Sequence, residues 1–111
     1  MEKLTIGTIV LVTFPFSNLK GKKIRPALIV ANVEFGNVIL CQITSKPYAS
    51  KTAIRIDSSN FANGSLPMTS FIRPDKLFTA DTSIISGIAG NLVVKTKNKV
   101  LQKIKKLFSI S

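Results

Sequence analysis

Short apolar runs rich in β-branched residues recur along the chain up to residue 90, and glycine, proline, asparagine, aspartate or serine bounds each run. Runs of this kind predict β-strands. The predicted strands span residues 8–14, 26–33, 37–44, 52–57, 69–78 and 83–90. Their even spacing favours a small barrel or sandwich. Pro74 interrupts the fifth run, and we expect an edge, a bulge or a break there because proline has no N–H to donate.

The C-terminal segment follows a different period. In KTKNKVLQKIKKLF, residues 95–108, the apolar positions are Val100, Leu101, Ile104, Leu107 and Phe108. This spacing of i, i+1, i+4, i+7 and i+8 predicts an amphipathic helix with an apolar arc of about 120°. Most of the lysines lie on the opposite side, and we interpret them as the solvated face of a helix packed against the barrel.

These patterns predict one mainly β domain of the α+β class over residues 1–111. No linker, repeat or low-complexity segment divides the chain, and 45% of its residues are hydrophobic, which is enough for a core without disulfides. Cys41, the single cysteine, lies in the apolar run VILCQI and is predicted to be a buried thiol. A lone cysteine fits a reducing compartment. With no apolar run near the roughly 18 residues of a membrane span and no signal-peptide pattern, we expect a cytoplasmic protein away from membranes.

The charge balance narrows the expected partners. Sixteen Lys and Arg residues stand against five Asp and Glu, a formal charge of +11. This excess favours nucleic acid or an acidic protein segment, and less readily a membrane surface, although a lysine-rich genome composition would give the same count. The chain has no histidine, so no side chain with an unperturbed pKa near 7 is present to shuttle protons. One cysteine and five scattered acids give no metal-ligand spacing, and neither a metal nor a cofactor is expected.

The segment EFG, residues 34–36, predicts a short hairpin turn between the second and third strands. With three residues in the loop, the numbers of paired residues sum to 70; with four they sum to 69, which places Arg25 opposite Thr44. In either register the two residues lie within about one position of each other, where cross-strand Cβ atoms are roughly 4.5–5.5 Å apart. Arg25 precedes Pro26, which favours an extended backbone. The neighbouring polar residues are Lys22, Lys23, Ser45 and Lys46.

An arginine and a threonine hydroxyl at one end of a sheet suit the cleavage of RNA. When the 2′-hydroxyl attacks the adjacent phosphorus, negative charge builds on the non-bridging oxygens, and the guanidinium fork of Arg25 matches a phosphate. The hydroxyl of Thr44 adds a further donor to the same charge. Arginine keeps its proton and is a poor general base, so a modest rate is expected. Alternatively, Arg25 is a solubilising residue before a strand and Thr44 is an ordinary strand end.

Four stretches resemble the MazF/PemK family, the RNA-cleaving toxins of bacterial toxin–antitoxin pairs. They are GTIVLVTFPFSNLKGKKIRPALIV at residues 7–30, LCQITSKP at 40–47, TSFIRPDKLFTADTSII at 69–85 and GNLVVKTKNKVLQKIKKLF at 90–108. The resemblance covers nearly the whole chain, and residues 48–67 are the least distinctive part. The arginine–proline pair is a weak signal by itself, whereas the ordered set at family-like spacing is more specific.

This resemblance implies an SH3-like barrel, a homodimer and metal-independent cleavage of single-stranded RNA, with an acidic antitoxin protein as a partner. The expected product end is a 2′,3′-cyclic phosphate. The family's catalytic arginine falls on Arg25 and its catalytic threonine on Thr44. One departure is Thr8, which stands where most members carry an acid after the opening glycine. This departure puts the role of that acid in doubt.

The resemblance also implies an RNA-binding surface beside these two residues. The loop of residues 15–23, PFSNLKGKK, would overhang the cleft, and Gly21 would give it freedom. The expected RNA-binding residues are Phe14, Lys22, Lys23, Ser45 and Lys46. The lysines would follow phosphates, and Phe14 or Phe16 would stack on a base if exposed. Alternatively, one of these phenylalanines is in the core and the other packs beneath the loop.

Two other functions are compatible with these residues. A related barrel is used by toxins that poison DNA gyrase through protein contact, without catalysis. The chain would also fit an RNA-binding module whose catalytic geometry has decayed. The pairing of Arg25 with Thr44 favours the nuclease, because a gyrase poison would not need it.

Overall fold

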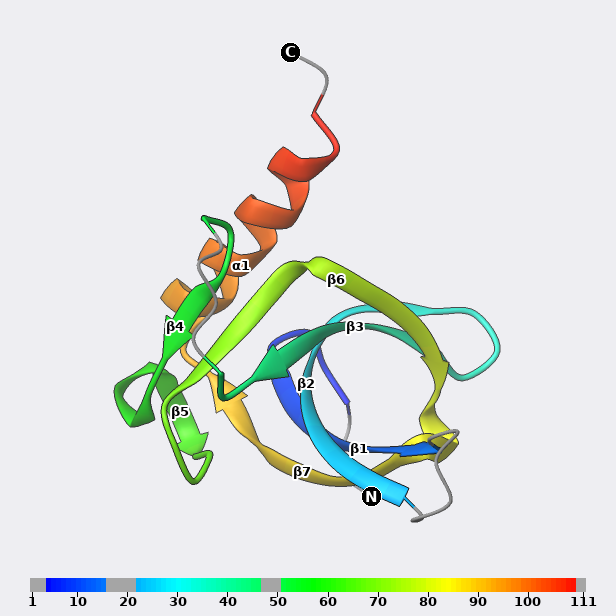
Figure 1. Cartoon of the computed structure of the whole chain (residues 1–111). Helices are drawn as coiled ribbons and strands as arrows, with labels where there is room; N and C mark the ends of the chain where they lie inside the picture. Colours follow the sequence, from blue (N-terminus) through cyan, green and yellow to red (C-terminus); the bar gives the residue numbers. More distant parts are fainter. Residues whose placement is uncertain (1–3, 16–21, 47–50, 110–111) are drawn as a thin grey trace.

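Seven β-strands and one α-helix make up the part of the chain that the computed structural model describes, which is residues 4–15, 22–46 and 51–109 (Figure 1). The strands are β1 (Thr8–Pro15), β2 (Lys22–Val33), β3 (Asn37–Thr44), β4 (Ile54–Ile56), β5 (Phe61–Gly64), β6 (Ser70–Asp81) and β7 (Ile85–Leu92). The helix α1 (Val94–Leu107) follows β7. Two short 3-10 helices, η1 (Ser58–Asn60) and η2 (Thr82–Ile84), precede β5 and β7.

All seven strands belong to one antiparallel sheet with the order β4-β6-β3-β2-β1-β7-β5. The two edge strands, β4 and β5, are neighbours in the chain with only η1 between them, so the sheet has to curl until its ends come close together. Figure 1 looks into this curl, with β1, β2, β3, β6 and β7 around its interior and α1 outside it. The predicted mainly β barrel with a C-terminal amphipathic helix is therefore confirmed.

Both faces of the curled sheet are buried at its centre, which explains the runs of consecutive apolar residues in its central strands, such as residues 27–31 of β2. Along β2, Ala27 and Ile29 belong to one apolar cluster and Leu28 to another, because successive side chains of a strand point to opposite faces. The cluster that contains Leu28 also contains Val100 of α1, which is fully buried. Since α1 lies outside the curl, this is the outer cluster, and the cluster of Ala27 and Ile29 fills the interior.

Two features of the strands differ from the sequence prediction or sharpen it. β2 begins at Lys22, four residues before the predicted strand 26–33, so Arg25 lies within the strand rather than ahead of it. Pro74 lies at a bulge, one of the three expected outcomes. There the pairing of β3 with β6 passes from Cys41↔Leu77 to Gln42↔Arg73, and three residues of β6 have no partner in β3.

The structure adds one strand, β5, that the sequence pattern did not predict. Its sequence, FANG, is short and mostly exposed, so it lacks the apolar run that marks a strand. Gly64 has a φ of 72°, and a Cβ on Gly64 or on Gly90 of β7 would meet the backbone of the opposite strand. β5 therefore pairs with β7 through a close backbone approach that only glycine permits. Separately, no helix in the described residues is long and apolar enough to cross a membrane.

Candidate functional site

A cleft opens where β2 and β3 separate. Their pairing stops at Ala27↔Gln42, next to Pro26, whereas the pairing of β2 with β1 continues to the first residue of β2. Beyond this point the end of β3 pairs only with β6. Proline has no N–H to donate to a neighbouring strand. The pairing of β2 with β1 continues past Pro26, so the hydrogen bond that is missing at Pro26 is one to β3. Pro26 thus marks the place where the two strands part.

The cavity beside this separation has a volume of about 440 Å³. It is bounded by β1, β2, β3, β6 and the segment before β6. Its lining residues are Leu11, Lys23, Ile24, Arg25, Pro26, Gln42, Ile43, Thr44, Ser45, Lys46, Leu66, Pro67, Met68, Ser70, Arg73 and Lys76. Five of these sixteen residues are lysine or arginine and none is acidic, so the cavity is suited to an anion.

Arg25 and Thr44 line this cavity from the two diverging strands, and both are half-buried. The hairpin combines both registers that its sequence allows. Paired residue numbers sum to 70 next to the turn and to 69 from Ile29↔Leu40 onward, with an irregularity between the two stretches. Continued by two residues beyond the last recorded pair, the second register sets Arg25 across from Thr44. Because the strands have separated here, the two residues border a shared space.

The hydroxyl of Thr44 is held by the turn that follows β3. The backbone N–H of Lys46 donates to Thr44 Oγ1 over 3.2 Å. A hydroxyl that accepts in this way still carries its own proton, so this bond leaves the O–H of Thr44 able to donate. Ser45 and Lys46 are exposed at the same strand end and also line the cavity.

The bulge in β6 contributes two cations that sequence reasoning missed. Arg73 directly precedes the unpaired residues of β6, Lys76 is the last of them, and both line the cavity. The side chain of Arg73 is only 17% exposed, and its Nη2 lies 3.0 Å from Oδ2 of Asp75, so a carboxylate just outside the lining holds the guanidinium. The sequence signal for these two cations was Pro74, because a proline inside a strand indicates a bulge, and a bulge redirects the side chains next to it.

The segment before β6 forms an apolar wall of the cavity, which sequence reasoning also missed. Leu66 and Pro67 come from the region with the least distinctive sequence, and Met68 directly follows it. Met68 is 59% exposed, and Ile24 of β2 is 57% exposed. Large exposed apolar side chains beside cations give a surface on which the face of a base can pack while its phosphate meets a charge.

The remaining residues that the sequence predicted for RNA binding divide into two groups. Lys23 is exposed and lines the cavity, as do Ser45 and Lys46. The backbones of Phe14 and Lys22 lie in β1 and β2, but their side chains fall outside the described part of the chain, as do residues 16–21 of the predicted loop. A role for these residues stays a prediction.

Cys41 is fully buried, as predicted, and its thiol donates to the backbone oxygen of Arg73 over 3.4 Å. Burial, and secondarily the charge of Asp75, raises the pKa of Cys41 to about 12. The side chain is thus a thiol at neutral pH, and a buried thiol is a poor nucleophile. Among the residues that the structure describes, no group of three or more His, Cys, Asp or Glu side chains is placed to hold a metal ion.

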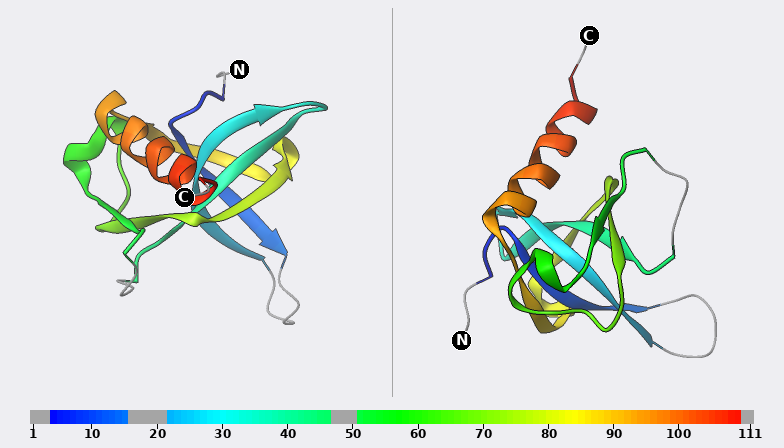
Figure 2. Two further views of the ribbon diagram at one scale, coloured as in Figure 1. Left: turned by 90° about the horizontal axis from the view of Figure 1, so that it is seen from above. Right: turned by 90° about the vertical axis from the view of Figure 1, so that its left-hand side faces the viewer.

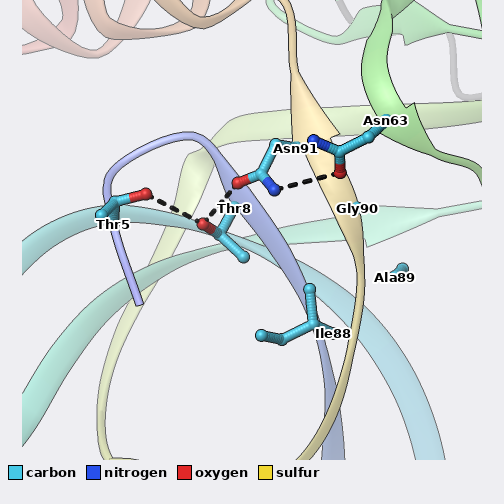
Figure 3. A pocket seen from close by; sticks show the side chains of 7 residues that line it. All are labelled: Thr5, Thr8, Asn63, Ile88, Ala89, Gly90 and Asn91. Atoms are coloured by element: carbon cyan, nitrogen blue, oxygen red, sulfur yellow. Dashed lines mark hydrogen bonds between the residues drawn. The ribbon is translucent and has the colours of Figure 1, made fainter. Parts of the chain in front are cut away.

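Thr8, which replaces the expected acid, lies away from this cleft. It is 2% exposed and donates a hydrogen bond of 2.7 Å to Oδ1 of Asn91 in β7. Thr5 lies 3.2 Å from the Thr8 hydroxyl, and Nδ2 of Asn91 donates to Asn63 over 3.1 Å (Figure 3). These residues line a separate cavity of about 510 Å³. In this chain the position therefore links β1 to β7 and is not among the residues that line the cleft.

Comparison with known proteins gives one family match. A family model described as "PemK-like, MazF-like toxin of type II toxin-antitoxin system" matches residues 5–108. No curated protein sequence matches.

Several solved structures share the fold. The MazE–MazF complex (Form-II) from Deinococcus radiodurans aligns with a TM-score of 0.76 at 18% identity, covering 99% of this chain and 100% of that chain. An endoribonuclease in complex with its cognate antitoxin, from a mycobacterial species, gives a TM-score of 0.71 at 17% identity and covers 95% and 94%. The Mycobacterium tuberculosis toxin MazF-mt6 gives 0.66 at 19% identity and covers 92% and 98%. At these identities the likeness establishes a common fold.

Proposed function

The chain belongs to the PemK-like, MazF-like toxins of type II toxin–antitoxin systems, and on that basis we propose that it is an endoribonuclease that cleaves single-stranded RNA without a metal ion. The observation that carries the proposal is the placement of Arg25 and Thr44 in one cavity whose lining is rich in cations and free of carboxylates. Solved structures of the same fold that are described as endoribonucleases support the assignment.

In the proposed reaction the 2′-oxygen of one nucleotide attacks the adjacent phosphorus. A new O2′–P bond forms, the P–O5′ bond breaks, and the products are a 2′,3′-cyclic phosphate and a free 5′-hydroxyl. The guanidinium of Arg25 donates to the non-bridging oxygens as their charge grows, and the O–H of Thr44 donates to the same group. Arg73, held by Asp75, adds a second guanidinium for the substrate phosphates.

Proton transfer is the weak part of this mechanism. The lining residues include no histidine and no carboxylate, and arginine keeps its proton at any physiological pH. Water therefore takes the proton from the 2′-hydroxyl and supplies one to the leaving 5′-oxygen, so the rate is modest. Hard divalent cations such as Mg²⁺ prefer carboxylate oxygens, which this lining lacks, and the reaction proceeds without them.

The apolar wall supports the proposed preference for single strands. Leu66, Pro67 and Met68 stand beside the cations, and a base has to leave its stack before its face can pack on them. A duplex keeps its bases stacked and paired, so it presents only phosphates to this cavity. Contacts between unstacked bases and this wall would give the enzyme its sequence selectivity.

Two protein partners complete the proposal, and both derive from the family. An acidic antitoxin segment would fold over the cationic cleft and exclude RNA from it, because a charge of +11 attracts a negative chain. A second copy of the chain, related by a two-fold axis, would extend the cleft into a longer groove. Structures described as a toxin with its antitoxin in this fold support the first partner.

The proposed function is tested by incubating the purified protein with a long single-stranded RNA in EDTA and identifying the new ends. We expect cleavage to persist in EDTA, with 2′,3′-cyclic phosphate or 3′-phosphate on one fragment and a 5′-hydroxyl on the other. An absolute requirement for magnesium, or fragments with a 3′-hydroxyl and a 5′-phosphate, would contradict the mechanism. Intact RNA together with inhibition of DNA gyrase would favour the non-catalytic toxin.

A further inference from the structure

The helix α1 carries as much positive charge as the cleft. Six of the sixteen Lys and Arg residues lie within its 14 residues, and none of those 14 residues is acidic. The six are Lys95, Lys97, Lys99, Lys103, Lys105 and Lys106. The five cations that line the cleft are all elsewhere in the chain. The charge on α1 is therefore a separate feature that the proposed reaction leaves unused.

Three of these lysines form a line along the exposed side of α1. At about 100° per residue, Lys95, Lys99 and Lys106 fall within about 40° of one another and more than 90° from the buried Val100. At 1.5 Å per residue they extend over about 16 Å of the helix. All three are exposed, and so is Gln102, which lies between them. We call Lys95, Lys99 and Lys106 the lysine stripe.

The lysine stripe as a whole adds little to the stability of the helix, because the helix dipole favours Lys106 in the last turn but disfavours Lys95 in the first. Lys95 and Lys99 are four residues apart, a spacing at which like charges repel, and Lys95 lies in the first turn, where the helix dipole disfavours a cation. Neither of the ion pairs Arg55–Asp57 and Arg73–Asp75 involves α1. A helix that needed only solubility would alternate glutamate with lysine and gain from the pairs. The arrangement instead suits an anion supplied from outside.

The chemistry of the stripe favours a phosphate backbone over a protein. A protein partner needs an apolar centre to bury, and no apolar side chain lies along the stripe. The exposed apolar residues Val94 and Phe108 lie at the two ends of the helix and more than 90° around it from the centre of the stripe. Phosphates require only cations at intervals along a line. We propose that the lysine stripe binds the backbone of RNA outside the segment that is cut, an inference that rests on the proposed function.

The position of α1 makes this contact depend on the length of the RNA. Both views of Figure 2 show α1 on one side of the curled sheet and the start of β2, which borders the cleft, extending away from it. The molecule measures 41 × 32 × 29 Å. We therefore expect a short RNA that fills the cleft to leave the outer face of α1 free, and a long RNA to pass around the barrel and contact both.

The test compares two charge-matched double variants. Lys99→Gln/Lys106→Gln removes two cations of the stripe, and Lys51→Gln/Lys105→Gln removes two exposed cations off the stripe and outside the cleft. Lys105 lies about 100° around the helix from Lys106. Glutamine is as good a helix former as lysine, so α1 persists in both variants. Binding is measured with two RNAs, of about 6 and about 40 nucleotides, in which 2′-deoxy substitution prevents cleavage. The shorter RNA is within the site size of one small nucleic-acid-binding barrel.

We expect the stripe variant to bind the long RNA about tenfold more weakly at low salt, with the slope of log K against log salt reduced by about 1.4, or 0.7 for each lost phosphate contact. Its binding and cleavage of short RNA, and all properties of the control variant, should stay within about twofold of wild type. An equal loss in the control variant, an equal loss on short RNA, or no loss on long RNA would each overturn the proposal. If wild type cleaves no RNA, the proposed function fails, but the comparison with uncleavable RNA still decides the role of the stripe.

Discussion

Arg25 and Thr44 border the same cavity but are supported by different neighbours. Arg25 is paired with Val12 of β1, and Thr44 with Phe71 of β6. Neither residue is in the buried core. A substitution at one of them leaves the support of the other intact, so changes at these two positions test chemistry more than folding.

The hydroxyl of Thr44 should matter through the proton that it donates. We expect Thr44→Ala to lower the single-turnover rate of RNA cleavage by about 10- to 1,000-fold, the range for losing one donor to a developing anion. Thr44→Ser keeps the hydroxyl and is expected to retain a rate well above that of the alanine variant. Equal rates for the alanine and serine variants would show that the hydroxyl does not act on the phosphate.

Cys41 gives the protein a predictable response to alkaline pH. Burial raises the pKa of its thiol from 9.0 to about 12, so above pH 9 the unfolded chain releases a proton that the folded chain keeps. The stability contributed by this group is complete below pH 9 and is lost as the pH rises toward 12. Between about pH 8 and pH 10.5 the free energy of unfolding should therefore fall further for wild type than for Cys41→Ala. Equal falls in the two proteins would contradict the shifted pKa.

Much of the arrangement of elements could be predicted from the apolar pattern. Counting residues outward from the predicted turn along the second and third strands placed Arg25 near Thr44. The period of the apolar residues in the C-terminal segment predicted α1. The divergence of the strands at Pro26, the bulge that brings Arg73 into the cavity, and β5 could not be predicted in this way. Each depends on which backbone groups face each other across strands, and the apolar pattern of one strand does not contain that information.

The attachment of α1 to the sheet can be tested with two valines of the same helix. Val100 is fully buried in the outer cluster, and Val94 is 64% exposed. We expect Val100→Ala to reduce the free energy of unfolding by about 2 kcal/mol, through lost burial and the cavity left behind. Val94→Ala should change it by less than about 0.5 kcal/mol, because an exposed site loses little and alanine favours the helix. Denaturant unfolding measures both, and similar losses for the two variants would mean that α1 is not packed as described.

At the scale of the whole molecule, charge sets how the proposed antitoxin finds its target. Cations line the cleft and cover α1, and the net charge is +11. Raising salt from about 50 to about 500 mM shortens the Debye length to well below 10 Å, so association with an acidic antitoxin segment should slow markedly. Dissociation should change less, because contacts with the apolar wall of the cleft are not screened. Stopped-flow mixing separates the two rates, and an association rate independent of salt would contradict this account.

The central claim is that the cleft containing Arg25 cuts RNA, and the most direct test is to compare two arginine variants with wild type in EDTA. Arg55 is a suitable control, since its side chain is 63% exposed, is not among the residues that line the cleft and forms an ion pair with Asp57 at the surface, a contact worth little. We predict that wild type and Arg55→Ala cleave a long single-stranded RNA at rates within about twofold of each other, whereas Arg25→Ala gives no measurable cleavage although its thermal unfolding is unchanged. Cleavage by Arg25→Ala at a rate near that of wild type would contradict the account.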